Sequence, residues 1–396
     1  MESADESASP HQNMAHENYR AMESQLVNAP LHQAALHGSA QRLHELIDDG
    51  ADINARVSAR ELTALHIAVQ WDDEETAKLL VEAGANVSAP TFDGVTPLHN
   101  AAAAGSVSLA TLLLEAGANP NARNIDHETP LHVVALFGND RLAELLVEAG
   151  ADVTAGDCYG NTPLHIAAAH EFLDMARLFL EGGADVNARN NNGDPVLHHA
   201  MADRPASVTL LLDNGADPLA TGEGGGTALH RAVQSCPAIV PRLLDAGADI
   251  RSTSTDGATP LHVAAAWGRT GGKQQVERLV AAGADIHALD NSGATPLHYA
   301  AAAWGSSERL RALLEAGANV SATTNDGESA LYCTLGHPST AFQCHDKDLE
   351  EKITVLIDAG ADVNTRTTYG QTLLGRAQEM DNRIVMQALD GRGAIQ

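Results

Sequence analysis

Aromatic and basic side chains are scarce in this chain of 396 residues. Aromatic residues make up 3% of it, and 24 Lys and Arg stand against 52 Asp and Glu, for a net charge of −28. With so few aromatics, the core must be built mainly from small Ala and Leu side chains. Because Lys and Arg supply the affinity for phosphates, the shortage of basic residues excludes nucleic acid as an expected partner.

Cysteine and long apolar runs are scarce too. The four cysteines are scattered along the sequence, at Cys158, Cys236, Cys333 and Cys344. This pattern favours a reducing compartment, the cytoplasm or alternatively the nucleus, over a disulfide framework. No apolar run is long enough to span a membrane, and residues 1–28 lack the apolar core of a signal peptide. We expect residues 1–18 to be disordered and residues 19–28 to form a partial capping helix.

Motifs of catalysis are missing as well. The sequence has no GxSxG, GxxxxGK[ST], HExxH or CxxC string. The Gly-rich stretch "TGEGGGTALH" at 221–230 lacks the preceding buried strand and the Lys of a phosphate-binding loop, so it is interpreted as a flexible loop tip. We therefore expect neither an enzyme nor a bound cofactor.

One string is present in abundance: "TPLH" and looser copies of it. The Leu of this string serves as a marker, and it recurs at steps of 32 to 36 residues with a last step of 43. A second string, "GAD" or "GAN", recurs in phase with it. The period predicts about ten full repeats and a truncated eleventh over residues 29–391, with a tail over 392–396. The markers are Leu31, Leu65, Leu98, Leu131, Leu164, Leu197, Leu229, Leu261, Leu297, Leu331 and Leu374.

Each repeat begins with a helix start signal. In repeat 3, Thr96 is suited to the N-cap and Pro97 to the first helical position. His99 falls at the third helical position, where its side chain can reach back to the cap as in a capping box. In "GDPVLHH" of repeat 6, Asp194 and Pro195 are predicted to supply the cap and the first position one residue early. The recurring His is thus interpreted as architectural.

A second helix follows in each repeat. In "SLATLLLEAG" the spacing of Leu109, Leu112 and Leu113 places them on one helix face. Gly117 is expected to end this helix in the left-handed conformation. The stretch that leads to the next repeat has the composition of turns.

At these residues the chain resembles the ankyrin repeat family. The resemblance implies an all-α repeat solenoid, in which each repeat has two antiparallel helices and a projecting β-hairpin finger. It also implies that the Thr and His of each motif bond each other and the neighbouring repeat. The sequence departs from the family pattern at Ala29, in the finger before Thr63, at Tyr332 and at Gly375.

The resemblance implies a binding face made of finger tips and the exposed ends of the first helices. Large side chains interrupt the small residues of this register, and they are the candidate partner-binding residues: Trp71, Phe137, His170, Trp267 and Trp304 at helix ends, and Phe92, Ile125, Tyr159 and Tyr369 at finger tips. Trp and Tyr carry a large share of interface energy, which favours a protein ligand anchored on Trp71, Phe137 and Trp267. The alternative is that these rings pack against the next finger.

The acidic charge permits two interpretations. Because it follows the repeat, it serves solubility in an extended array. It also attracts a basic partner by electrostatic complementarity.

Two insertions separate paired helices, near 268–273 and 336–348. The second lies in the irregular stretch 332–352, which contains four side chains of the zinc-ligand types: Cys333, His337, Cys344 and His345. Their spacing matches no familiar zinc finger, so we interpret the stretch as a solvated loop without metal. The alternative is an enzyme or metal-dependent protein that uses this insertion together with His170 and His199.

A modification is implied by the resemblance alone. Ankyrin loops of this form are substrates of an asparaginyl hydroxylase, and the matching positions are Asn54, Asn187 and Asn364. A structural role in the finger explains these residues equally well.

The sequence as a whole predicts a non-enzymatic, monomeric scaffold or adaptor that grips a protein partner with repeats 2–9. Inhibition of a partner enzyme by occlusion is an alternative that the sequence does not separate from scaffolding.

Overall fold

The structure, a computed structural model, describes residues 29–201, 205–267, 272–303, 307–335 and 346–394. The predicted disordered segment and capping helix of residues 1–28 lie outside these ranges. The chain divides into two compact parts, which we call the N-terminal half (described from residue 29 to 191) and the C-terminal half (192 to 394).

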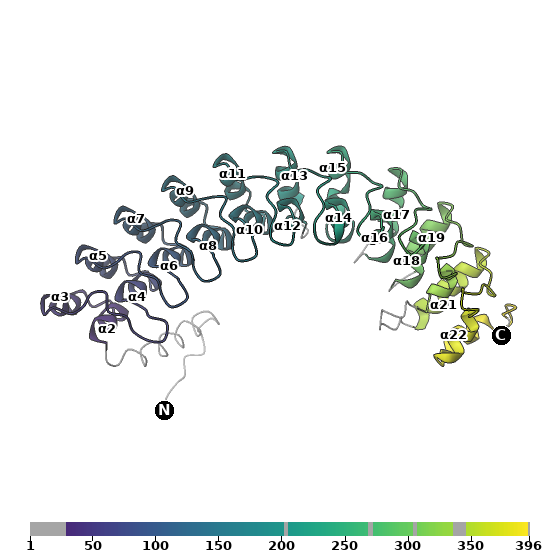
Figure 1. Ribbon diagram of the computed structural model, residues 1–396, viewed down its shortest axis with the longest axis horizontal. Coiled ribbons are helices and arrows are strands. Elements are labelled where there is room, and N and C mark those ends of the chain that lie inside the picture. The colour runs from purple at the N-terminus through teal and green to yellow at the C-terminus, as the bar shows by residue number, and fades with distance from the viewer. Residues whose placement is uncertain (1–28, 202–204, 268–271, 304–306, 336–345, 395–396) are drawn as a thin grey trace, which may run out of the picture. The chain divides into compact units, whose positions relative to one another are not determined.

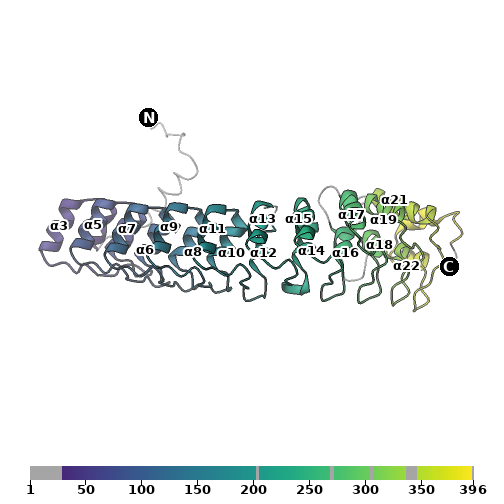
Figure 2. The ribbon, with the colours of Figure 1, turned by 90° about the horizontal axis from the view of Figure 1, so that it is seen from above.

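The N-terminal half consists of five helix pairs, one for each of repeats 1–5. The first helices pack side by side in one layer and the second helices in another, and the loops between repeats project as fingers from one edge (Figures 1 and 2). The pairs are α2 (Pro30–Leu36) with α3 (Ala40–Asp48), α4 (Ala64–Gln70) with α5 (Glu74–Glu82), α6 (Pro97–Ala104) with α7 (Val107–Glu115), α8 (Pro130–Phe137) with α9 (Asp140–Glu148), and α10 (Pro163–His170) with α11 (Leu173–Glu181).

The C-terminal half continues the same order with repeats 6–11. Two short 3-10 helices, η1 (Glu223–Gly225) and η2 (Pro237–Ile239), flank α14. The pairs are α12 (Val196–His199) with α13 (Pro205–Asp213), α14 (Ala228–Ser235) with α15 (Val240–Asp245), α16 (Pro260–Ala266) with α17 (Gly272–Ala281), α18 (Pro296–Ala302) with α19 (Glu308–Glu315), α20 (Ala330–Cys333) with α21 (Asp346–Asp358), and α22 (Leu373–Glu379) with α23 (Arg383–Leu389). The eleventh pair therefore has both of its helices.

The helix start signal works as predicted. In repeat 3, the backbone N–H of Thr96 donates to Nδ1 of His99 at 3.1 Å, and the Thr96 hydroxyl lies 2.9 Å from the same nitrogen. Because Nδ1 accepts the N–H, Nε2 carries the proton and donates to the carbonyl oxygen of Glu128 at 3.1 Å. The recurring imidazoles are buried, and each links a helix start to the finger of the next repeat. The same capping pattern is found for Thr63 with His66, Thr129 with His132, Thr227 with His230, Thr259 with His262 and Thr295 with His298.

The predicted start of repeat 6 is wrong. Pro195, not Asp194, is the N-cap, with extended dihedral angles of −74° and 159°, and α12 has only four residues. Pro195 occupies the Thr position of the motif because Leu197 and His198 are buried in the register of the other repeats. The Asp194 carboxylate accepts a hydrogen bond from the Glu223 N–H at 2.8 Å.

The core is built mainly from Leu and Ala, and Phe179 is its largest fully buried side chain. The second helices end as predicted, since Gly117 has a φ of 88°, which favours Gly over residues with a Cβ. Leu109 and Leu113 are buried, while Leu112 is half-buried.

The fingers are turns rather than full β-hairpins. In the described part of the chain the only β-type pairings are isolated antiparallel bridges, such as Val57 with Leu62. Neighbouring fingers are joined by backbone hydrogen bonds, for example from Ile125 N–H to the Asp93 oxygen at 2.9 Å. This row of bonds fixes each finger tip against the next within its half.

Tyr332 takes over part of the role of the His that it replaces. Its hydroxyl donates to Oε1 of Gln371 in the next repeat, and the Arg376 guanidinium lies 4.8 Å from its ring centroid. In repeat 11, the Gly375 N–H still bonds Oγ1 of Thr372 at 3.2 Å. The departures from the family pattern therefore preserve contacts between or within repeats.

Side chains from the next repeat cap the first helices of repeats 8 and 9. Nη1 of Arg309 donates to the Ala265 oxygen at 3.3 Å, near the end of α16. Nζ of Lys352, a buried side chain, donates to the carbonyl oxygens of Ala303 and Ala301 at the end of α18. The last residues of the predicted insertions, 272–273 and 346–348, belong to α17 and α21, and the rest of both insertions lies outside the described residues.

Candidate protein-binding face

The exposed side of the first helices is apolar at α8. Leu136 and Phe137 are 48% and 61% exposed, and Val133, one turn earlier, is half-buried. Ile166 follows at the same register position of α10 as Val133. The spacing of three and four residues places Val133, Leu136 and Phe137 on one stripe of α8, which we call the α8 stripe.

A second aromatic group adjoins the end of α8. The His170 and Phe172 rings are stacked, with centroids 5.6 Å apart and planes at 14°. A Cβ on residue 138 would lie 2.5 Å from Cζ of Phe172, and Gly138 has a φ of 79°. Gly138 is therefore required both for the turn and for the close approach of the Phe172 ring.

The finger tips of repeats 3–5 carry further exposed apolar side chains. Phe92 is 75% exposed, Ile125 64% and Tyr159 69%. Backbone bonds hold these tips in a row: Phe92 N–H donates to the Arg60 oxygen and Cys158 N–H to the Asp126 oxygen, at 2.9 and 2.7 Å. The apolar groups are thus presented on a fixed backbone, which reduces the entropy lost on binding.

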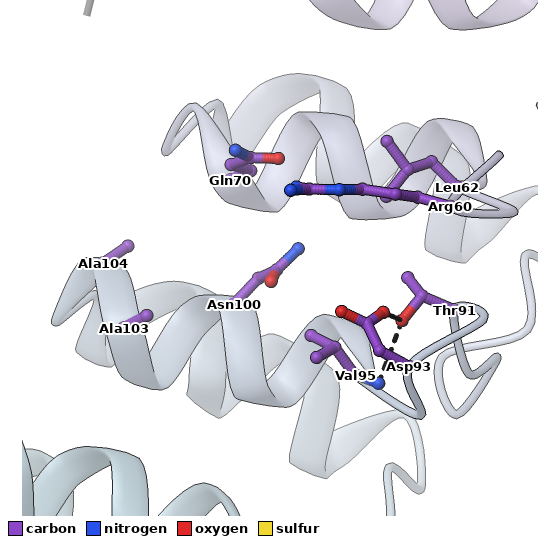
Figure 3. A pocket seen from close by; sticks show the side chains of 9 residues that line it. All are labelled: Arg60, Leu62, Gln70, Thr91, Asp93, Val95, Asn100, Ala103 and Ala104. Atoms are coloured by element: carbon purple, nitrogen blue, oxygen red, sulfur yellow. Dashed lines mark hydrogen bonds between the residues drawn. The ribbon is translucent and has the colours of Figure 1, made fainter. Parts of the chain in front are cut away.

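A cleft of about 350 Å³ lies between α4, α6 and the adjacent fingers. Arg60 extends along α4 toward Gln70, and the Asp93 carboxylate points toward Asn100 (Figure 3). Oδ1 of Asp93 accepts the Thr91 hydroxyl at 2.7 Å, and Ala103 and Ala104 line the far end. The cleft therefore offers one cation, one anion and two carboxamides beside a small apolar surface.

Two finger tips of this half hold strained residues. Glu61 and His127 have φ values of 56° and 60°, where most other fingers have Gly, for example Gly94 at 79°. Residues with a Cβ disfavour this conformation. The two strained tips flank the finger that carries Phe92.

The predicted anchor residues differ in exposure. Trp267 is 62% and Tyr369 84% exposed, and His170 is also exposed. Trp71 is only half-buried at the end of α4, with a buried indole nitrogen, and is thus less available than the other predicted anchors. Trp304 lies outside the described residues.

Two of the three residues of the α8 stripe, Val133 and Leu136, were not predicted from the sequence. They lie two and five residues after the marker Leu131, and the helix period of 3.6 residues, extended back from Phe137, would have found them. The cleft residues Arg60 and Asn100 come from different repeats, so no single-repeat pattern indicates them.

The C-terminal half carries internal ion pairs on its first helices. Nη2 of Arg231 lies 2.8 Å from both carboxylate oxygens of Asp194, and Oδ1 of Asp194 is 3.6 Å from Nδ1 of His198. Burial alone would raise the pKa of Asp194, but the Glu223 N–H and the Arg231 guanidinium hold that pKa below its usual range. Glu328 and Arg376 form a similar pair at 3.8 Å.

Of the four side chains of the zinc-ligand types, only Cys333 lies in the described residues. Cys333 is half-buried, and burial together with Glu328 raises the pKa of its thiol to about 12, which disfavours the thiolate that binds metals. His337, Cys344 and His345 lie outside the described residues. Within the described ranges, no group of three or more His, Cys, Asp or Glu side chains is placed to hold a metal ion.

The asparagines predicted as modification sites lie in the loops that open each finger. Oδ1 of Asn54 accepts the Asn86 N–H at 2.7 Å, and Nδ2 of Asn364 donates to the Gly393 oxygen at 3.0 Å. Asn54 and Asn187 are exposed. Asn54 and Asn364 thus bridge neighbouring repeats, as a structural role requires.

Helices that could cross a lipid bilayer are absent from the described residues.

Comparison with known proteins agrees with this architecture. The sequence matches "Ankyrin repeats (3 copies)" over residues 31–124, 117–190, 180–254, 197–290, 229–324 and 261–341. It is 41% identical over 69 residues to the nuclear factor NF-kappa-B p105 subunit of Mus musculus, which is 17% of this chain and 7% of that protein. It is also 41% identical over 69 residues to putative ankyrin repeat protein FPV031 of fowlpox virus, 17% of this chain and 20% of the viral protein. The chain thus spans only a small part of these relatives.

Two solved ankyrin repeat domains are similar in structure. The domain of human ASB11 matches with a TM-score of 0.50 and 29% identity, over 56% of this chain and 99% of that one. The domain of Bcl-3, described as a unique member of the IkappaB protein family, matches with a TM-score of 0.50 and 30% identity, over 55% and 99%. The buried Thr–His helix starts and the helix pairs agree with the family match over residues 31–341. The chain therefore belongs to the ankyrin repeat family.

Proposed function

We propose that the chain is a protein-binding scaffold that holds a segment of a partner protein on the first-helix face and finger tips of its N-terminal half. Ankyrin repeats are protein-interaction modules, and this family is typically non-enzymatic. One relative is by name a subunit of a nuclear factor. The family thus supports protein binding, while the face is our proposal.

The observation that carries the proposal is the exposure of Leu136 and Phe137 on the α8 stripe. Large apolar side chains on a surface reduce solubility, so a group of them indicates an interaction site. Phe, Tyr and Trp also contribute strongly where they fill pockets of a partner. Ile125 lies on the finger that leads into α8, and Tyr159 lies on the finger that leads into α10. One ligand segment can therefore contact both helix and finger side chains.

Site-specific crosslinking tests the proposal. A photoreactive amino acid replaces Phe137 in one variant of the full chain and Arg141, an exposed residue of α9, in a matched control. We expect a discrete, saturable crosslinked protein from position 137 that Leu136→Ser removes, with unchanged helical content and melting. Identical crosslinked products from both positions would contradict the proposed face.

A further inference from the structure

We infer that the segment bound by the N-terminal half is basic as well as apolar, with Lys or Arg side chains adjacent to its apolar ones. The inference rests on the proposed function and concerns the fingertip row, which we define as Phe92, Asp93, Ile125, Asp126 and Tyr159. In two tips of this row, an exposed apolar residue is followed directly by Asp. A ligand side chain that covers the apolar group therefore lies within reach of a carboxylate.

Neither of these two carboxylates, those of Asp93 and Asp126, has an ion-pair partner among the described residues. Asp93 accepts the Thr91 hydroxyl through Oδ1, and its carboxylate faces the cleft (Figure 3). A basic ligand group gains an attraction here without having to displace an internal cation.

The aliphatic stems of Lys and Arg suit the apolar members of the row. Such stems pack on apolar surface while the charged end stays at the carboxylates. The Phe92 and Tyr159 rings also attract cations placed over their faces. The net charge of −28 adds a long-range attraction for a basic segment.

Arg60 sets the register of the bound segment. Among the described residues it is the one cationic side chain that lines the cleft, and its guanidinium extends toward Gln70 (Figure 3). A Lys or Arg of the ligand is repelled at the Arg60 end and attracted at the Asp93 end. The cleft therefore favours one placement of the basic side chains.

At the finger-tip position, the described residues of the C-terminal half lack this combination, although exposed Leu289 precedes Asp290 outside that position. Asp256 and Asp326 occupy the finger positions of Asp93 and Asp126, but polar Thr255 and Asn325 precede them. On the first-helix face of that half, Asp194 is already paired with Arg231. Asp256 and Asp326 therefore provide matched controls for the effect of charge alone.

A peptide-display library of random sequences tests the inference. Peptides are selected for binding to the full chain, and those that also bind the variant Phe92→Ser/Ile125→Ser/Tyr159→Ser are removed. We expect the retained peptides to be enriched in Lys or Arg beside large apolar residues. Their affinity should fall roughly tenfold in Asp93→Asn/Asp126→Asn, weaken with salt, and stay unchanged in Asp256→Asn/Asp326→Asn.

Four results would overturn the inference. Retained peptides of acidic or neutral composition, or an equal loss of affinity in both Asp→Asn pairs, contradict a specific basic ligand. Peptides that depend on Leu136 and Phe137 but not on Asp93 and Asp126 contradict it while supporting the proposed function. A library from which no peptide is retained contradicts both.

Discussion

Nε2 of His99 lies 3.1 Å from the carbonyl oxygen of Glu128, which joins the start of the first helix in repeat 3 to the finger that precedes repeat 4. The two residues are 29 positions apart in the sequence, so each bond of this kind links one repeat to the next. The stability of the array is therefore shared among many equivalent contacts.

Replacing a single cap should have a modest, local effect. We expect Thr129→Ala to destabilise repeat 4 by about 1 kcal/mol, because the hydroxyl at the helix start is lost while the bond from the residue 129 N–H to His132 remains. Hydrogen exchange of the α8 amides measures this change. Thr209→Ala in α13, where the Thr is half-buried and not a cap, is the control and should change stability by less than about 0.5 kcal/mol.

The buried imidazoles should make the fold sensitive to mild acid. Burial lowers the pKa of His66 from 6.5 to about 4, and it also lowers the pKa of His99, His132 and His262. Below pH 6.5 the unfolded chain therefore takes up protons that the folded chain does not. As the pH is lowered below 6.5, the free energy of unfolding should decrease by about 1.4 kcal/mol per pH unit for each such His, until the pH reaches the pKa of that His in the folded chain.

Urea unfolding at a series of pH values measures this dependence. The slope should become smaller in His66→Gln, since one of the titrating groups is removed. A stability that rises as pH falls below 6.5 would show that these imidazoles are protonated in the folded state.

The Asp194–Arg231 pair should be important for repeats 6 and 7. We expect Asp194→Ala to destabilise the C-terminal half by about 2 kcal/mol, because the Arg231 guanidinium and the Glu223 N–H lose their shared acceptor. As the pKa of Asp194 is lowered, its contribution is present above the unfolded pKa and is lost as pH falls through the folded one. Asp256→Ala, at an exposed finger tip, is the control for denaturant unfolding, and equal effects of the two would contradict the prediction.

Replacing a strained residue at a finger tip by Gly should increase the stability of the chain. We expect His127→Gly to stabilise the chain by about 1 kcal/mol, since Gly adopts a φ of 60° without steric cost. His127→Ala keeps the Cβ and should bring no gain. Thermal melting of both variants measures the difference, and a stabilising Ala would indicate that the His side chain, not its backbone, is unfavourable.

The repeat was predicted from the period of its markers. Local signals predicted the helix starts and the Gly residues that end the second helices, because each signal depends on residues only a few positions apart. The start of repeat 6 was wrong because buried Leu197 and His198 set the register there, and Pro195 follows it. At the candidate site, the exposed tips at Phe92 and Ile125 were found from their positions. The cleft could not be predicted, since Arg60 and Asn100 meet only when two repeats stack.

The capping of α16 and α18 by Arg309 and Lys352 has a consequence for how this array can evolve. Each cation donates to a helix end 44 to 51 residues earlier in the chain, so this capping requires the preceding repeat. Duplication or loss of a single repeat in this region would separate the buried ammonium group of Lys352 from its acceptors at the end of α18, or would leave carbonyl groups at a helix end without these donors. We expect natural variants of the chain to gain and lose modules elsewhere, and to inherit repeats 8–10 as one block.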